Sequence, residues 1–384
     1  MLPQWLFWIC LGLVVYIYVG YPVGVFLLAP IFNRSVRKAD IQPRITVVIA
    51  AYNEEEDIER TIVNKLSQDY PAECLEVIVV SDGSTDATDA IVQRLAERSD
   101  GRVRLLRQDR QGKTQALNLA ATHATGDILV FSDANSIYGP TALRALMRSF
   151  ADPSVGYVTG KMIYTNLASS GIGEESGMYM SYENLLRTLE TRLGSVVGVD
   201  GGIDAVRREL YLPMRADQLP DFVLPLNVVE QGKRVVYEPE AVVYEQALSK
   251  SSDELRMRVR VSLRALWALY DKRGLFNPFR DPVFAWQLLS HKAFRYGAFI
   301  PLAGLFVFNL LALGENAFYS WFLLLQTTSY VAAGIGHLLR RSPAVASKAL
   351  VPYYFVILNV ACVLAFWKFV HGQKLVLWKP RGGA

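Results

Sequence analysis

The chain is apolar at both ends, and its middle alternates short apolar runs with polar segments. Residues 5–28 contain no charged side chain, and a helix of that length, at about 1.5 Å per residue, is long enough to cross a bilayer. Residues 296–313, 317–339 and 349–370 are apolar stretches of comparable length. The pattern predicts one transmembrane helix near the N-terminus, kinked at Gly20-Tyr21-Pro22, and about three near the C-terminus.

The charged residues follow this division. Residues 1–33 carry none and residues 293–372 carry six, of 40 basic and 36 acidic residues in the chain. Four basic residues follow the first span and favour the cytoplasmic side for the middle of the chain: Arg34, Arg37, Lys38 and Arg44.

Four spans would place the C-terminal tail outside, whereas the basic residues of the tail favour the inside. Either one span is re-entrant or the tail is an exception to the rule. The basic residues of the last loop are Arg340, Arg341 and Lys348, and those at the tail are Lys368, Lys374, Lys379 and Arg381.

Residues 254–272 predict an amphipathic helix. Arg256, Arg260 and Arg264 recur every four residues beside an apolar and aromatic face, a pattern that suits the headgroup layer of a membrane. An ordinary surface helix is the alternative. Residues 284–292 are expected in the same layer. The chain therefore divides into a first span (1–32), a soluble domain (33–250), interfacial helices (251–292), about three spans (293–372) and a tail (373–384).

Four β-branched runs in the soluble domain begin at intervals of 25–32 residues and are separated by helical patterns. This alternation is typical of βαβ units, and near-continuous apolar runs are typical of strands buried in a parallel sheet. The predicted fold is α/β, with a Rossmann-like, mostly parallel sheet. Because ligands bind beyond the carboxyl ends of such strands, the residues after each run are candidate site residues. The runs are Ile45–Ala50, Val77–Val80, Val103–Leu106 and Ile128–Phe131.

Polar residues that suit a nucleotide follow the first three runs. Asn53 and Glu54 follow the first, where the start of a helix alone does not require them. Asp82 follows the second, and its carboxylate can accept a hydrogen bond from a ribose hydroxyl or a base N–H. Lys113 follows the third and can neutralise a diphosphate. Its segment is no P-loop, because Arg107 stands where that motif needs its first glycine.

Asp133 and Asn135 follow the fourth run and supply two oxygen ligands, two positions apart. Magnesium or manganese bound through one or two carboxylates plus substrate phosphates needs such a pair. Other chemistry is disfavoured. The three cysteines and four histidines show no zinc spacing, and the net charge of +4, without a basic tract interleaved with aromatics, argues against nucleic acid as a partner.

The strand-end segments resemble the family 2 inverting glycosyltransferases of the GT-A fold, and in particular their membrane branch. That branch includes the cellulose, hyaluronan, chitin-oligosaccharide and poly-N-acetylglucosamine synthases. The resemblance covers about residues 44–270, and the flanking spans fit the same branch. The matching segments are Val48 to Glu54, Val80 to Asp86, Gly112 to Asn118 and Ser132 to Asn135.

The resemblance implies where a nucleotide sugar binds. It places the uridine and ribose on Tyr52, Glu54 and Asp82. It places the nucleotide phosphates near Lys113 and Asp133.

The resemblance also assigns the metal, Mg²⁺ or Mn²⁺, to Asp133 with Asn135. Asn135 stands where the common motif has a second acidic residue. The amide keeps an oxygen ligand but removes a charge, so the affinity for the metal and the choice of metal are both affected.

The acceptor side is implied by two further segments. Gly201 and Gly202 stand in a loop that leads to a strand and matches the acceptor-side loop of the family. Asp221, at the family's usual interval before Gly232, matches the catalytic carboxylate. An exposed loop aspartate is the alternative for Asp221.

The Gln-x-x-Arg-Trp motif of the processive members is absent. Arg258 and Arg260 stand at about its place and are the candidates for contact with the diphosphate, but no tryptophan follows either of them. Trp267 replaces the missing acceptor platform only if the local geometry shifts.

The function predicted is transfer of a sugar from a nucleotide sugar, UDP-linked by resemblance, to a growing polysaccharide. Transfer of one sugar to a lipid or lipid-linked acceptor is a second hypothesis, and a non-catalytic nucleotide sensor is a third. By analogy the protein is a multi-pass protein of a bacterial inner membrane with a cytoplasmic catalytic domain. A homo-oligomer or an export partner is compatible with this reading.

Overall fold

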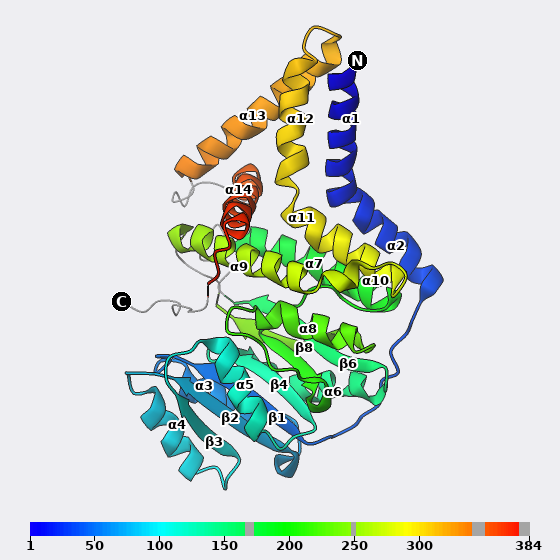
Figure 1. Cartoon of the computed structure of the whole chain (residues 1–384). Helices are drawn as coiled ribbons and strands as arrows, with labels where there is room; N and C mark the ends of the chain where they lie inside the picture. The colour runs from blue at the N-terminus through cyan, green and yellow to red at the C-terminus, as the bar shows by residue number, and fades with distance from the viewer. Residues whose placement is uncertain (166–172, 247–250, 340–349, 376–384) are drawn as a thin grey trace. The chain divides into compact units, whose positions relative to one another are not determined.

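The computed structural model describes residues 1–165, 173–246, 251–339 and 350–375, which divide into two units. A helical unit comprises residues 1–31, 166–183 and 247–374, and a sheet unit comprises residues 32–165, 184–246 and 375–384 (Figure 1). Residues 173–183, expected within the soluble domain, group with the helical unit. The basic residues at 340, 341, 348, 379 and 381 lie outside the described residues.

The sheet unit is built on one eight-stranded sheet in the order β3-β2-β1-β4-β7-β6-β8-β5. All four strands expected from the sequence form, and they pair in parallel as β3-β2-β1-β4. The second half is mixed, because β7 runs antiparallel to both β4 and β6. The strands are β1 (Ile45–Ala51), β2 (Leu75–Asp82), β3 (Val103–Gln108), β4 (Ile128–Asp133), β5 (Ile137–Tyr138), β6 (Val155–Tyr164), β7 (Ile203–Arg207) and β8 (Arg234–Glu245).

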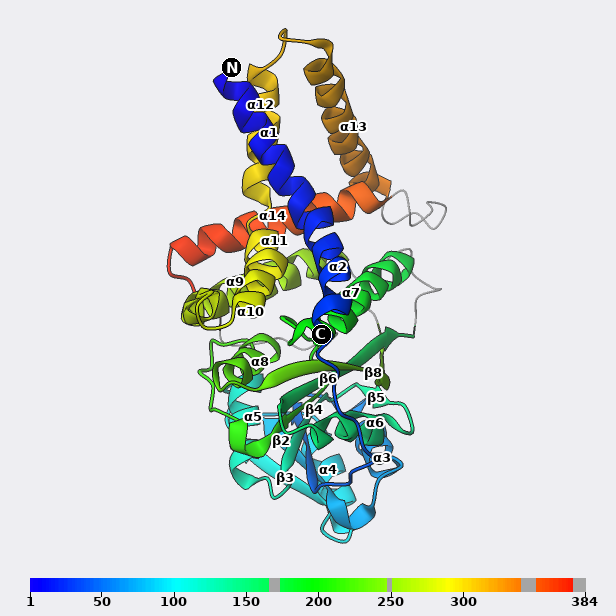
Figure 2. The same ribbon diagram turned by 90° about the vertical axis from the view of Figure 1, so that its right-hand side faces the viewer.

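Helices cover both faces of the sheet (Figure 2). On one face lie α3 (Ile58–Leu66), α4 (Thr88–Glu97) and α6 (Ala142–Arg148), and on the other lie α5 (Lys113–His123) and α8 (Pro220–Glu230). Right-handed crossovers explain α3, α4 and α5, because the chain moves outward from β1 to β3 and then returns to β4. β1 is buried along almost its whole length, as a strand covered on both faces should be.

The register of β7 brings a distant loop to the predicted site. Ile203, the first residue of β7, pairs with Ser132 near the carboxyl end of β4. The residues just before β7 must therefore lie at the edge of the sheet where Asp133 lies. Gly201 and Gly202 thus reach the same edge as the strand ends of the parallel half.

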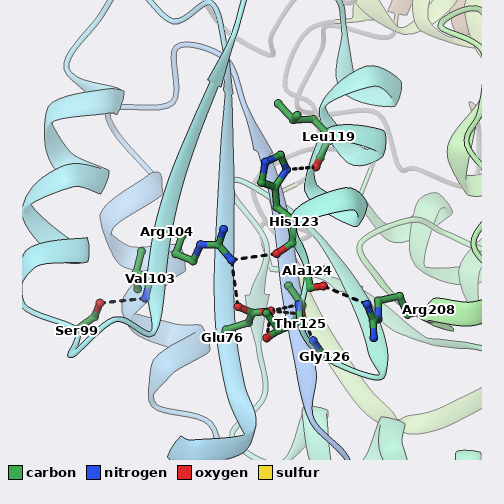
Figure 3. Close-up of polar contacts among 11 residues, drawn as sticks. Glu76, Ser99, Val103, Arg104, Leu119, His123, Ala124, Thr125, Gly126 and Arg208 are labelled. Carbon is green, nitrogen blue, oxygen red and sulfur yellow. Dashed lines mark hydrogen bonds and ion pairs between the residues drawn. The ribbon is translucent and has the colours of Figure 1, made fainter.

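The opposite edge of the sheet is closed by a hydrogen-bond network around Glu76 (Figure 3). Glu76 Oε1 accepts from the backbone and hydroxyl of Thr125 at 2.6 and 2.8 Å and from Thr46 Oγ1 at 2.5 Å. Arg104 NH1 lies 3.7 Å from Glu76 Oε2 and also donates to the His123 carbonyl. The network holds the loop between α5 and β4 at the amino ends of the parallel strands, opposite the end where the predicted site residues lie.

The helical unit begins with one long apolar helix interrupted by a π-helical turn. This helix comprises α1 (Leu2–Val15), η1 (Tyr16–Gly20) and α2 (Tyr21–Phe32), so the expected break at residues 20–22 takes the form of a π-turn that ends at Gly20. Buried Phe7 packs against Leu305 and Tyr319. The other helices of the unit are α9 (Ser251–Asp271), α10 (Pro282–Gln287), η7 (Leu288–Ala293), α11 (Phe294–Tyr296), α12 (Phe299–Leu311), α13 (Ala317–Leu339) and α14 (Val351–Val370), together with part of α7 (Gly173–Leu193).

Three of these helices are long and apolar enough to cross a membrane: Leu2–Phe32, Ala317–Leu339 and Val351–Val370. The stretch expected at 296–313 differs from the prediction, because the helix breaks after Tyr296 and resumes at Phe299 with a bend of 60° between the two parts. Counted as one broken span, this pair raises the number to four. By length and composition, these helices are candidate membrane spans.

Candidate active site

Asp82 ends β2 in a nearly closed cage of hydrogen-bond donors. Its side chain is 3% exposed, and its oxygens accept from the backbone N–H groups of Gln111 and Gly112 at 2.8 to 3.1 Å. Gln108 Nε2 donates to Oδ1 at 2.7 Å. The loop after β3 is thus wrapped around the carboxylate at the end of the neighbouring strand. These hydrogen bonds fix the position of Lys113, which directly follows Gly112.

Arg110 joins Asp82 to Tyr52. Its NH1 lies 2.8 Å from Asp82 Oδ2, and its guanidinium lies 3.3 Å from the centre of the Tyr52 ring. The structure therefore brings together Tyr52 and Asp82, two of the predicted nucleotide residues. Arg110 itself was not predicted, although it stands in the segment after the third run, where the strand-end rule would have found it.

The loops after β1 and β2 are tied to each other. Asn53 has a left-handed backbone, with φ of 53°, and its Oδ1 accepts from the backbone N–H of Thr85 at 2.8 Å. The backbone N–H of Glu54 donates to Thr88 Oγ1 at 2.8 Å. Asn53 is a residue type that tolerates this conformation, so its role here is to shape the loop that carries Tyr52 and Glu54.

Lys113 lies between two carboxylates from distant parts of the chain. Its Nζ is 2.6 Å from Asp133 Oδ1 and 3.8 Å from Asp221 Oδ1. Asp133 ends β4, whereas Asp221 stands in the first turn of α8. Although burial opposes it, the charges of Asp133 and Asp221 raise the pKa of Lys113 above its usual value, so the side chain is a cation. The side chain of Lys113 thus contacts both carboxylates.

Asp221 lies directly against the glycine loop. Gly201 has a φ of +86°, and a Cβ at this position would lie 2.5 Å from Asp221 Cγ and 2.6 Å from Oδ2. The position therefore requires glycine both for its backbone and for its space. Asp221 is half-buried, with 31% of its side chain exposed, and stands in a helix rather than in an exposed loop.

Asp133 and Asn135 are both half-buried, whereas Ala134 and Ser136 between and after them are buried. The two oxygen-bearing side chains therefore share the accessible side of this turn. Among the described residues no group of three or more His, Cys, Asp or Glu could hold a metal. The donor set fits a hard divalent cation that takes its remaining ligands from phosphate oxygens, and it does not fit a closed protein cage.

Behind this turn lies a buried polar cluster that the sequence did not predict. Ser136 is fully buried, its carbonyl accepts from Lys65 Nζ at 2.6 Å, and its hydroxyl forms a short hydrogen bond with Glu245. A Cβ on Gly202 would lie 2.8 Å from Glu245 Oε1. Glu245 therefore supports the metal turn and the glycine loop together. It ends β8, so the rule of inspecting strand ends would have identified it.

Two more acidic residues flank the glycine loop. Asp200 forms a bidentate ion pair with Arg187, whose side chain is only 6% exposed. Asp204, in β7, is 1% exposed, and burial, with a further contribution from the charge of Asp221, raises its pKa to about 8. The first pair fixes the start of the loop, and Asp204 is a mostly neutral carboxyl at pH 7.

Arg258 and Arg260 lie on α9 of the helical unit, and their contact with a diphosphate stays a prediction. Trp267, on the same helix, is already packed. Its ring lies 4.6 Å from that of Phe369, its Nε1 donates to the carbonyl of Gln373 at 2.8 Å, and Lys374 Nζ lies 4.9 Å from the ring. The indole is therefore packed within its own unit, and its use as an acceptor platform stays a prediction.

One protein-family model matches the part of the chain that carries the site. This model, described as glycosyl transferase family 2, matches residues 46–212. Poly-beta-1,6-N-acetyl-D-glucosamine synthase of Staphylococcus aureus is 29% identical over 228 residues, which are 56% of this chain and 54% of that protein. An N-acetylglucosaminyltransferase of Rhizobium leguminosarum bv. viciae is 26% identical over 262 residues, 64% of this chain and 58% of that one. The chain thus spans little more than half the length of these curated relatives.

The fold has a solved counterpart. The mannosyltransferase PcManGT from Pyrobaculum calidifontis, solved in complex with GDP-Man and Mn²⁺, superimposes with a TM-score of 0.71 and covers 96% of this chain and 99% of its own. At 23% identity the likeness shows the fold alone, and it agrees with the GT-A fold implied by the resemblance of the strand-end segments. With sheet, family model and relatives in agreement, the sheet unit has the GT-A fold, and residues 46–212 match the model of glycosyl transferase family 2.

Proposed function

We propose that the protein transfers a sugar from a nucleotide sugar to the hydroxyl of a saccharide acceptor, with inversion at the anomeric carbon. The observation that carries the proposal is the position of Lys113, which contacts both Asp133 and Asp221. A donor diphosphate at Asp133 and an acceptor hydroxyl at Asp221 would then lie on two sides of one sugar. A non-catalytic nucleotide sensor would not need a carboxylate at Asp221.

The reaction is a single displacement. Asp221 accepts the proton of the acceptor hydroxyl while the hydroxyl oxygen forms a bond to the anomeric carbon of the donor sugar. The bond from that carbon to the diphosphate oxygen breaks on the opposite face. A positioned general base contributes about 10²–10⁴-fold. Lys113 offsets charge on the departing diphosphate, and such electrostatic stabilisation is commonly the larger contribution.

A divalent cation belongs to the same proposal. Asp133 and Asn135 are the protein ligands, and Mg²⁺ or Mn²⁺ bound there supplies Lewis-acid stabilisation of the leaving group. Arg110 contacts Tyr52 and Asp82, the residues proposed to bind the base and the ribose. A bound nucleoside would therefore displace the Arg110 guanidinium or share Asp82 with it. The family resemblance implies a UDP-linked donor, whereas the structural neighbour was solved with GDP-Man. The assay below compares transfer from both kinds of donor.

The acceptor has two candidates. A growing polysaccharide is favoured by the matched synthase of Staphylococcus aureus. A single addition to a lipid or lipid-linked acceptor is favoured by the absence of the Gln-x-x-Arg-Trp motif of the processive members. A bacterial inner membrane with the sheet unit in the cytoplasm belongs to either candidate.

The test is an assay of the purified full-length protein in liposomes with a panel of nucleotide sugars, following release of the nucleoside diphosphate and the size of the product. Asp221→Asn is expected to lower transfer by about 10²–10⁴-fold while nucleotide binding persists, because the amide keeps the shape but cannot take the proton. Asp69→Asn, at an exposed carboxylate paired with Arg144, is the control and should retain activity.

Near-normal turnover of Asp221→Asn would place the base elsewhere. No diphosphate release with any donor and acceptor would support the sensor. A ladder of products from wild type would indicate the polysaccharide, and one discrete glycolipid would indicate single addition.

A further inference from the structure

α14 satisfies the length and hydropathy of a membrane span, yet its neighbours are those of a helix that lies flat. Its C-terminal half runs beside α9. Val259 and Leu263 of α9 form one core cluster with Ala361 and Ala365 of α14. One turn further on, Trp267 packs on Phe369. Two small residues on α14, Ala361 and Ala365, allow this close approach over about two helical turns.

The depth of α9 limits the depth of α14. Ser262 Oγ lies 4.0 Å from Cys362 Sγ, at the middle of α14. Ser262 stands among four arginines within three turns of helix, at positions 256, 258, 260 and 264. If α14 stood upright with Cys362 at the bilayer centre, α9 would carry these charges into the hydrocarbon, where an arginine is strongly disfavoured.

Two further contacts of α14 lie at one end of the α12–α13 hairpin, and Phe355 of α14 also packs on Tyr18 of η1, with ring centres 5.4 Å apart. Tyr353 packs on Gly336, in the last turn of α13, where a Cβ would lie 3.0 Å from Tyr353 Cβ. Phe366 packs on Phe299, the first residue of α12, with ring centres 5.6 Å apart. Because a short turn joins α12 to α13, the start of the first and the end of the second lie at the same end of the hairpin. One helix that contacts both at that end crosses them.

The view in Figure 2 agrees: within the helical unit, α14 runs crosswise to α1, α12 and α13. Exposed apolar side chains occur along the whole of α14, among them Val351, Val360, Val363, Trp367 and Val370, which are between 42% and 64% exposed. Apolar surface on a helix that lies beside a basic amphipathic helix fits the boundary between headgroups and acyl chains.

We propose that α14 is not a transmembrane span but lies with α9 in the headgroup layer, so that the two helices form one surface that binds the lipid bilayer. The end of α13 at Leu339 and the end of α14 at Val370 then lie on one side of the membrane, and the chain crosses the bilayer three times instead of four. Three crossings remove the conflict between the side of the membrane predicted for the tail and its basic residues.

The first test is sidedness. Single-cysteine variants of the full chain, made after Cys10→Ala, Cys74→Ala and Cys362→Ala, are labelled with a membrane-impermeant maleimide in right-side-out and inverted vesicles. Glu73→Cys reports the sheet unit, Glu315→Cys the turn between α12 and α13, and Gln373→Cys the end of α14. We expect Gln373→Cys to label with Glu73→Cys and opposite to Glu315→Cys. Labelling of Gln373→Cys together with Glu315→Cys would overturn the proposal.

The second test is depth, measured by the accessibility of nitroxide labels to oxygen and to a water-soluble nickel complex. Labels at Val351→Cys, Val363→Cys and Val370→Cys should all report one shallow depth. A span would instead change in depth by about 1.5 Å per residue and be deepest near Val363. Trp321→Cys, Leu325→Cys and Leu338→Cys on α13, all 62% to 79% exposed, form the control series and should show the gradient of a span. A gradient of the same form on α14 would refute the interfacial placement.

Discussion

At the scale of single residues, Gly201 sets the position of the proposed base. Its left-handed backbone and the 2.5 Å between a Cβ and Asp221 Cγ mean that Gly201→Ala must displace the carboxylate. A displacement of about 1 Å at a reacting group costs on the order of 10²-fold in rate. Gly201→Ala is therefore expected to lower kcat for sugar transfer by about that factor, measured by release of the nucleoside diphosphate.

Gly232→Ala is the matched control for Gly201→Ala. Gly232 also has a left-handed backbone, with φ of +75°, but a Cβ there meets nothing within 4 Å. It carries the backbone strain of about 1–2 kcal/mol without the collision. We expect lower stability and retained turnover. Equal loss of turnover in both variants would show that strain, and not contact with Asp221, is responsible.

Asp204 makes a prediction about pH. Its folded pKa of about 8 exceeds the unfolded value of about 3.9, so between these two pH values the unfolded chain has released a proton that the folded chain keeps. This carboxyl therefore lowers the free energy of unfolding as pH rises through that window. Asp204→Asn removes the effect, and its thermal midpoint relative to wild type should rise steadily from pH 5 to pH 8.

The control for Asp204→Asn is Asp100→Asn, an exposed position whose left-handed backbone, with φ of 50°, suits asparagine equally well. Its midpoint should follow that of wild type at every pH. A constant offset between Asp204→Asn and wild type across the pH range would mean that Asp204 does not retain its proton.

At the scale of elements, the loop between α5 and β4 depends on Glu76. Although burial opposes it, hydrogen bonds from Thr46 and Thr125 and the charge of Arg104 lower the pKa of Glu76. Glu76→Gln should lower stability by about 1–3 kcal/mol at pH 7, seen as a lower thermal midpoint and faster hydrogen exchange at the Thr125 amide. The contribution is present above the unfolded pKa of about 4.3 and is lost as pH falls through the lower folded pKa, so the two proteins should converge in acid.

An exposed ion pair provides the comparison for Glu76→Gln. Glu59 pairs with Arg94 and is 52% exposed, so Glu59→Gln should change stability by less than about 1 kcal/mol. A similar loss in both variants would argue that the network around Glu76 is no stronger than a surface pair.

The strand ends show why much of the site was predictable. In a parallel sheet the residues after each strand meet at one edge, so a pattern of local runs was enough to bring Asp82, Lys113 and Asp133 together. The mixed half of the sheet was not predictable in this way. Whether β7 runs parallel or antiparallel to β4 depends on pairing with residues more than seventy positions away. This pairing buries Asp204, and nothing in the sequence around Asp204 indicates that burial.

Glu245 and Arg187 illustrate the same limit. Glu245 stands at a strand end, but its contact with Ser136 depends on β5 and β8 being neighbours. Arg187 lies on a helix with no periodic signal that distinguishes it, and only its ion pair with Asp200 connects it to the glycine loop. Hydropathy likewise identified α14 as apolar, yet apolarity cannot separate a helix that crosses a bilayer from one that lies along it.

At the scale of the whole molecule, the exposed apolar surface of the helical unit is typical of a surface in contact with lipid. Trp321, Leu325 and Leu338 on α13 and Trp5 on α1 are each more than 60% exposed, and soluble monomers rarely expose contiguous apolar patches of this kind. The full chain should therefore stay in the membrane pellet after extraction with alkaline carbonate and enter solution only with detergent. A peripheral protein held by charge alone is released by carbonate, and release of this chain under the same conditions would show that neither Leu2–Phe32 nor Ala317–Leu339 crosses the bilayer.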